Sequence, residues 1–115
     1  MVNEALDWNL QVNTMPGGRT ELRVAGELDL DTSPYLLAEF ERVIADHHPT
    51  EVVIDLSDLV FVDSSGLGTL VACWRRAERA RVAFSISNLC EDVALSLEIT
   101  GLTQILPIRQ LPDAA

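Results

Sequence analysis

The chain has 115 residues, 48% of them hydrophobic, and its 18 acidic and 8 basic residues give a formal net charge of −10. A surface this acidic is repelled by phosphate backbones and anionic membranes, and no apolar run reaches the roughly 20 residues of a membrane-spanning helix, so neither nucleic acid nor a membrane is an expected partner. One domain spanning residues 1–115 is expected at this length. The acidic start shows no secretory signal, which predicts the cytoplasm as the compartment.

The charge is unevenly distributed along the sequence. Residues 1–63 contain 13 acids and 3 arginines, a net charge of −10, whereas residues 64–115 contain 5 of each and are neutral. All the basic residues are arginine. The first half is therefore expected to form an acidic surface, while the segment after residue 63 is locally basic.

Two alternating segments begin the chain. Apolar residues alternate with polar ones in both: Leu6, Trp8, Leu10 and Val12, then Leu22, Val24 and Leu28. Between them, Thr14–Gly18 has the composition of a turn. The pattern predicts a β-hairpin with a five-residue loop.

An amphipathic helix is predicted next. Thr32 or Ser33 can cap it, and Pro34 suits its first turn because that position needs no N–H donor. Apolar positions follow at offsets of 0, 4, 7, 8 and 11: Leu36, Phe40, Val43, Ile44 and His47. His48-Pro49 is expected to end the helix.

Strand and helix patterns alternate in the second half. Val52–Ile54 is a continuous β-branched run, typical of a strand buried on both faces. Helical spacing follows over 67–77, strand alternation over 82–86, a second helical pattern over 91–99 ended by Gly101, and a short strand over 105–108. The predicted fold is therefore α/β: a mixed sheet with an N-terminal antiparallel hairpin followed by βαβαβ parallel units, with helices packed against the sheet.

The segment 51–71 is the most informative for function. A buried strand runs through a second apolar stretch, Leu59–Val62, into D-S-S-G just before a helix. In parallel sheets, ligands and partners meet the protein at such strand ends. A serine there is exposed near free backbone N–H groups, and Gly66 and Gly68 let another molecule approach closely. The purely structural alternative is that Asp63, Ser64 or Ser65 only caps the helix.

Catalysis and cofactor binding are poorly supported. A serine nucleophile needs a base, but His47 and His48 are predicted to lie elsewhere. Gly66-Leu67-Gly68 lacks the further glycine and the lysine of a phosphate-binding loop. No ligand spacing supports a metal at the histidines or at Asp29 and Asp31. The chain is therefore expected to be no enzyme and to use no cofactor, whereas Ser64 or Ser65 could be the substrate of a kinase.

The sequence resembles a known family at these residues. V-V-I-D-L-S-D-L-x-F-x-D-S-S-G-L-G, with G-E-L-D at 26–29 and T-G-L at 100–102, is similar to the STAS domain of bacterial anti-sigma factor antagonists. The resemblance covers about residues 8–109. It implies a partner-switching regulator that binds an anti-sigma factor, itself a serine kinase, and so releases sigma factor. It further implies that the kinase phosphorylates Ser64 to end binding and that a serine phosphatase restores it.

The expected partner-binding surface follows from this resemblance and from the basic helix. Asp29 matches the family's acidic residue near the phosphorylated serine. Arg75, Arg76 and Arg79 are expected on a solvated face, where they would meet acidic groups. The full set of partner-binding residues is Asp29, Asp63, Ser64, Ser65, Gly66, Leu67, Gly68, Arg75 and Arg76.

Two alternatives remain at this point. The chain could be a STAS scaffold or sensor that is not phosphorylated and binds a nucleotide or another anion. Cys73 and Cys90 could sense redox state, although buried, inert thiols are the expectation for cysteines of this kind.

Overall fold

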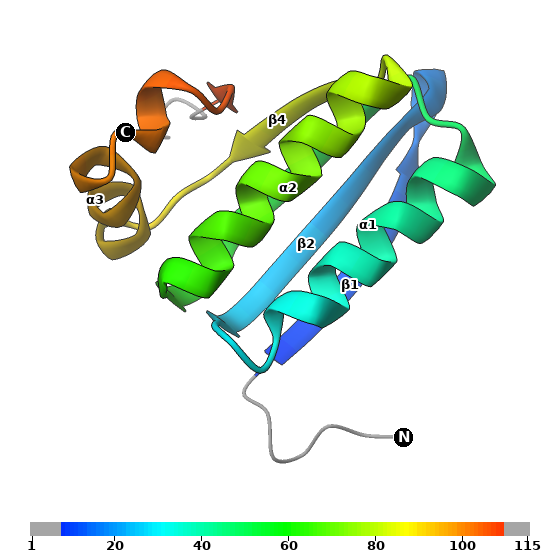
Figure 1. The fold of residues 1–115 in the computed structure, drawn as a ribbon. Helices are drawn as coiled ribbons and strands as arrows, with labels where there is room; N and C mark the ends of the chain where they lie inside the picture. Colours follow the sequence, from blue (N-terminus) through cyan, green and yellow to red (C-terminus); the bar gives the residue numbers. More distant parts are fainter. Residues whose placement is uncertain (1–7, 110–115) are drawn as a thin grey trace, which may run out of the picture.

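The computed structural model describes residues 8–109, which form one five-stranded sheet in strand order 1-2-3-4-5. The strands are β1 (Trp8–Met15), β2 (Arg19–Leu28), β3 (Glu51–Val62), β4 (Ala83–Ser87) and β5 (Ile108–Arg109). β1 pairs antiparallel with β2, and every later pair is parallel (Figure 1). The predicted mixed sheet with its N-terminal hairpin is confirmed.

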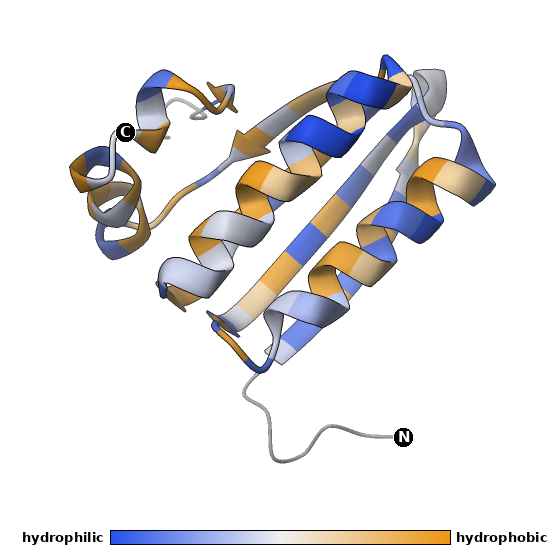
Figure 2. Cartoon of the chain, in the orientation of Figure 1, coloured by the Kyte–Doolittle hydropathy of each residue, from blue (hydrophilic) through white to orange (hydrophobic). Residues whose placement is uncertain are grey.

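Three α-helices connect the parallel strands: α1 (Ser33–His47), α2 (Ser64–Ala80) and α3 (Glu91–Ile99). Helices α1 and α2 lie side by side across one face of the sheet, and α3 lies beyond the end of β4 (Figure 1). Hydrophobic positions form bands along each helix and alternate with hydrophilic ones along β2 (Figure 2). None of the helices between residues 8 and 109 is long and apolar enough to cross a membrane.

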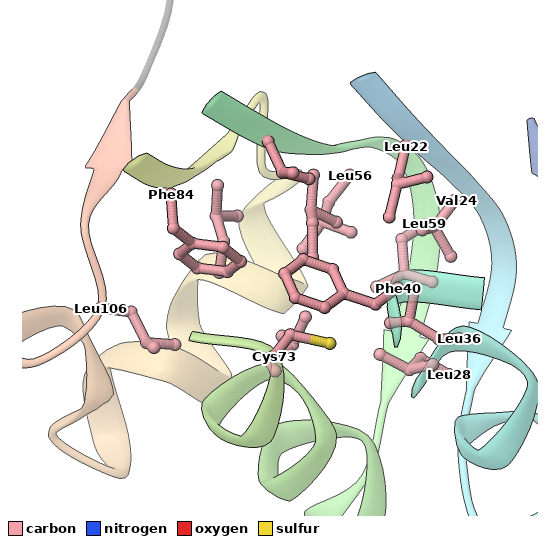
Figure 3. Packing of buried hydrophobic residues seen from close by; sticks show 14 of the residues in the cluster. Leu22, Val24, Leu28, Leu36, Phe40, Leu56, Leu59, Cys73, Phe84 and Leu106 are labelled. Carbon is pink, nitrogen blue, oxygen red and sulfur yellow. The ribbon is translucent and has the colours of Figure 1, made fainter. Parts of the chain in front are cut away.

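The core lies between these helices and the sheet (Figure 3). Phe40 of α1 and Phe84 of β4 meet edge to face, with ring centroids 5.9 Å apart, and Cys73 of α2 is buried in the same core. Edge-to-face pairs add to the gain from burying two rings. The run Val52–Ile54 is buried throughout, as its continuous β-branched pattern predicted.

The predicted hairpin loop was too long. β1 continues through Thr14 and Met15, which pair with Thr20 and Arg19 across the hairpin. The connection is a 3₁₀ turn, Pro16–Gly18, because two consecutive glycines adopt positive φ angles and reverse the chain within three residues. Leu6, the first residue of the predicted alternation, lies outside the described residues.

Three further boundaries differ from the predictions. His47 is exposed rather than on the apolar stripe, because α1 ends there and His48 turns away in a left-handed conformation. Val82 precedes β4, since its N–H donates to Ala77 at the end of α2. The last strand is 108–109 rather than 105–108, because residues 102–104 continue the chain as a 3₁₀ helix.

Candidate functional site

Strand β3 has two irregularities in its pairing with β2, and these determine which side chains face outward at its C-terminal end, just before Ser64. Its register against β2 shifts between Arg23 and Ala25 and again between Gly26 and Glu27. The second shift leaves Val60 as an extra residue between Leu59 and Phe61, which pair with Gly26 and Glu27. Extra residues of this kind redirect the side chains that follow. Leu59 and Val62 are therefore buried, while Val60 and Phe61 are 59% and 47% exposed.

Residues 63–68, which we call the serine corner, join β3 to α2. Asp63 is the N-cap: its Oδ1 accepts a hydrogen bond from the Gly66 N–H at 2.9 Å, and its carbonyl accepts one from Leu67. The structure thereby decides among the three candidate caps. Ser64 and Ser65 occupy the first helical positions, with Ser64 exposed and Ser65 half-buried.

The Ser64 hydroxyl makes no hydrogen bond within the part of the chain that the structure describes. It lies at the N-terminus of a 17-residue helix, where backbone N–H groups and the helix dipole favour an anionic group. The adjacent Asp63 carboxylate is already held by the Gly66 N–H. Ser64 is therefore exposed and takes no part in the cap.

A second turn lies directly beside the serine corner. Leu28 pairs with Val62, and the Leu28 carbonyl accepts a hydrogen bond from the Asp63 N–H at 3.2 Å. Asp29 follows Leu28, so the structure brings the turn that begins at Asp29 next to Asp63. Asp29 and Asp63 are more than 30 positions apart in the sequence. Two acidic residues thus follow the ends of neighbouring strands at the serine corner.

Asp29 also has a structural role that the sequence did not reveal. Its Oδ1 accepts hydrogen bonds from the N–H groups of Asp31 at 3.0 Å and Thr32 at 3.1 Å. The Thr32 hydroxyl donates to the Glu27 carbonyl instead of capping α1, and the Ser33 hydroxyl is buried without a partner in the described structure. Thr32 is the N-cap residue, one of the two predicted candidates, but its side chain makes no capping bond, because its hydroxyl is hydrogen-bonded within the preceding turn to Glu27 and Asp29.

Gly66 and Gly68 have different roles. A Cβ at Gly66 would lie 2.4 Å from the Leu28 carbonyl oxygen and 2.6 Å from Val62, so this glycine lets α2 pack onto its own strands. It is buried and unavailable to a partner, contrary to the expectation. Gly68 is exposed, and a Cβ there would meet nothing within 4 Å. Leu67, between them, is half-buried against the core.

The three arginines of α2 are not equivalent. Arg76 is half-buried, and its Nε donates to the Glu41 carboxylate on α1 at 2.6 Å. This ion pair joins the two helices, so Arg76 does not lie on a fully solvated face as expected. Arg75 and Arg79 are exposed, and neither forms an ion pair within the described residues.

Sequence reasoning also missed part of the surface around the corner. Leu30, in the turn after β2, is 71% exposed, and Val60 and Phe61 precede the serine corner on β3. The sequence hardly indicates that Val60 and Phe61 are exposed, because Leu59–Val62 has the pattern of one buried apolar run. Only the register shift in β3 shows that half of that run faces outward.

The two cysteines are free thiols in different surroundings. Burial raises the pKa of the Cys73 thiol to about 12, and the Glu41 carboxylate adds to the shift. Cys90 is half-buried and donates a hydrogen bond to the Leu59 carbonyl at 3.2 Å. Within residues 8–109 there is also no group of three or more histidine, cysteine or acidic side chains placed to hold a metal.

Comparison with known proteins agrees with this geometry. The STAS domain model matches residues 9–115. An anti-sigma F factor antagonist of Paenibacillus polymyxa is 29% identical over 87 residues, covering 76% of this chain and 74% of that protein. An anti-sigma-B factor antagonist of Bacillus subtilis is 28% identical over 88 residues, covering 76% of this chain and 79% of that protein.

A solved structure extends the likeness to three dimensions. A crystal structure of an anti-sigma factor antagonist from Mycobacterium paratuberculosis superposes with a TM-score of 0.79 at 28% identity, covering 93% of this chain and 87% of that one. These three proteins are all described as antagonists and none as an enzyme, in agreement with the expectation that this chain is no enzyme. The chain belongs to the STAS domain family.

Proposed function

We propose that this chain is an anti-sigma factor antagonist whose binding is switched by phosphorylation of Ser64. In the unphosphorylated form it binds a cognate anti-sigma factor, a serine kinase, and thereby releases sigma factor. Phosphorylation of Ser64 by that kinase ends binding, and a serine phosphatase restores it. The observation that carries the proposal is the exposed Ser64 hydroxyl, free of hydrogen bonds within the described residues, directly after a cap that another side chain supplies.

The surroundings of Ser64 suit a protein partner. Leu30, in the turn after β2, and Val60 and Phe61, near the end of β3, are exposed apolar residues close in sequence to Asp29 and Asp63, and Gly68 leaves the first turns of α2 open. Apolar area that is buried on association favours binding by about 25 cal/mol per Å² before the costs of association are subtracted. A partner that covers Ser64 and also buries part of this apolar area would gain from it.

The electrostatics of the corner suit a switch. A phosphoryl group adds about −1.5 to −2 charge beside Asp63 and next to the turn that holds Asp29. Burying that charge in an interface without a matching cation costs several kcal/mol. A change from 99:1 to 1:99 in a binding equilibrium takes about 5.5 kcal/mol, which one phosphoryl group can supply.

The helix acts in the opposite sense. The N-terminus of α2 stabilises a phosphate in the free protein by about 0.3–1 kcal/mol. This favours the modified free form but is small beside the cost of burying the phosphate. The cap at Asp63 occupies the Gly66 N–H, which limits how many backbone donors the phosphate can use.

The experiment compares Ser64 with its neighbour Ser65. Ser64→Ala is expected to bind the purified anti-sigma factor as the wild type does and to resist phosphorylation, and Ser64→Asp to bind much more weakly. Ser65→Ala is the matched control: it is expected to bind and to be phosphorylated normally. Equal affinity of Ser64→Ala and Ser64→Asp in a calorimetric titration, or phosphate on another residue by mass spectrometry, would refute the switch.

A further inference from the structure

A groove between α1 and α2 extends from the serine corner toward the other end of the molecule. It has a volume of about 300 Å³. Helix α1 contributes Leu37 and Glu41 to its lining. The side formed by α2 consists of Gly68, Val71, Ala72, Arg75 and Arg79. The groove therefore has apolar side chains along its length and two arginines toward the C-terminal end of α2, where Figure 2 shows the strongly hydrophilic bands.

The groove begins one helical turn after Ser64, at Gly68. Ser64, Gly68, Ala72, Arg75 and Arg79 follow one another at spacings of 4, 4, 3 and 4 residues, so they lie along one stripe of α2. At 1.5 Å per residue, Arg75 and Arg79 lie about 16 Å and 22 Å along the helix axis from Ser64. A protein seated over Ser64 and aligned with α2 would reach both arginines, and the exposed Gly68 places no side chain in its way.

The charge in the groove is opposite to that of the protein. The chain carries a net charge of −10, and Arg19, Arg23, Arg42, Arg76 and Arg109 all form ion pairs with its acids. Arg75 and Arg79 form none within residues 8–109, although Glu78 lies between them in sequence. The Glu41 carboxylate at the groove is held by Arg76.

Neither Arg75 nor Arg79 gains stability from an ion pair within the described residues. Like charges four residues apart on a helix repel each other by a few tenths of a kcal/mol. Three of the eight arginines, Arg75, Arg79 and Arg81, form no ion pair within residues 8–109, and of these Arg75 and Arg79 line the groove, where they are suited to acidic groups from outside. Guanidinium groups bind carboxylates in bidentate geometry, which adds specificity to charge attraction.

We infer that the α1–α2 groove is a second docking site for the anti-sigma factor, which places there a segment with an apolar side chain and at least one carboxylate. The apolar side chain packs against Leu37, Val71 and Ala72, and the carboxylate pairs with Arg75 and Arg79. This inference rests on the proposed function and identifies the surface outside the serine corner that selects the partner. Because Arg75 and Arg79 lie about 16 Å and 22 Å along the helix axis from Ser64, their contacts contribute to affinity in both phosphorylation states.

The test is charge reversal in the groove, with the purified anti-sigma factor kinase as the probe. Arg75→Glu puts a carboxylate four residues before Arg79, which is attractive, and three residues before Glu78, which is repulsive by a similar few tenths of a kcal/mol, so this variant is expected to fold about as stably as the wild type, which thermal unfolding checks. Its Kd for the kinase is expected to rise by about tenfold or more. In the phosphorylation assay its KM is expected to rise with little change in kcat, because the serine corner is intact.

Arg81→Glu is the matched control. It makes the same change of net charge on an exposed arginine just after α2, outside the groove. Its Kd is expected to stay within about twofold of the wild type, and the salt dependence of binding is expected to be weaker for Arg75→Glu than for Arg81→Glu.

The outcomes separate this inference from the proposed function. If the wild type neither binds the kinase nor is phosphorylated by it, the proposed function fails and the inference falls with it. If the wild type binds and Arg75→Glu binds equally well, or both reversals weaken binding equally, the groove assignment alone is wrong. Binding of ATP alone to the wild type that is lost in Arg75→Glu would also overturn it, in favour of a nucleotide site.

Discussion

The carboxylate of Asp63 accepts a hydrogen bond from the Gly66 N–H at 2.9 Å, and this contact starts helix α2 while leaving the intervening Ser64 exposed. The cap and the serine have separate tasks. Asp63 satisfies one of the unpaired donors of the first helical turn, so neither serine hydroxyl is needed for that purpose. A group can then be added to Ser64 without removing the cap.

The cap can be tested by two substitutions at Asp63. Asp63→Ala is expected to lower the free energy of unfolding by about 1 kcal/mol, because the Gly66 N–H loses its partner. Asp63→Asn keeps an accepting oxygen and is expected to cost much less. Urea denaturation measures both, and equal losses would show that the charge of Asp63, rather than its capping bond, stabilises the helix.

The two glycines of the corner should respond to alanine in opposite directions. Gly66→Ala is expected to destabilise the protein by about 1–3 kcal/mol, since its Cβ would collide with the Leu28 carbonyl and Val62. Gly68→Ala is expected to stabilise it by about 0.5–1 kcal/mol, because alanine is the better helix former and the position is open. Thermal unfolding of the pair provides the comparison, and a stabilised Gly66→Ala would contradict the packing described for α2.

The ion pair between Arg76 and Glu41 is expected to couple the two helices. A double-mutant cycle with alanine at both positions should give a coupling of about 0.5–1 kcal/mol, typical of a partly exposed pair. The same cycle with Arg75 in place of Arg76 serves as the control and should give a coupling near zero. A coupling of equal size in both cycles would mean that only general charge attraction is measured.

Cys73 is expected to be unreactive in the folded protein. Because burial raises its pKa to about 12, almost none of this thiol is ionised at pH 8, and a thiol reagent should reach it only after unfolding. In a Cys90→Ala background, which leaves one thiol, Ellman's reagent should label the protein in denaturant and not in native buffer. Rapid labelling of the native variant would contradict the burial of Cys73.

The same pKa predicts a loss of stability in alkali. The folded state holds the Cys73 proton more tightly than the unfolded state, so the stabilisation is complete below the ordinary thiol pKa of 9.0 and is lost progressively as the pH rises toward about 12. Within that window this thiol alone should lower the free energy of unfolding by about 1.4 kcal/mol per pH unit. The difference between wild type and Cys73→Ala, followed by urea denaturation from pH 8 to 11, isolates that slope.

The sequence by itself determined the order and type of the elements and the position of the serine corner. Alternation in β2, the β-branched run in β3 and the helical spacings of α1 and α2 depend on neighbours a few residues away, so they can be read along the chain. The D-S-S-G-L-G motif likewise lies within six consecutive residues. Its place between a buried strand and a helix followed from the patterns on either side.

Only the tertiary structure decided how the corner is built and what surrounds it. The Asp63–Leu28 hydrogen bond, the fit of Gly66 against Leu28 and the Arg76–Glu41 ion pair all join residues about 35 positions apart. The outward turn of Phe61 depends on the pairing register with β2 rather than on its own neighbours. Such contacts form when separate elements pack together, which is why a local pattern could place the serine and offer three candidate caps, but could not decide among them, show the contacts of Asp29 or reveal the groove.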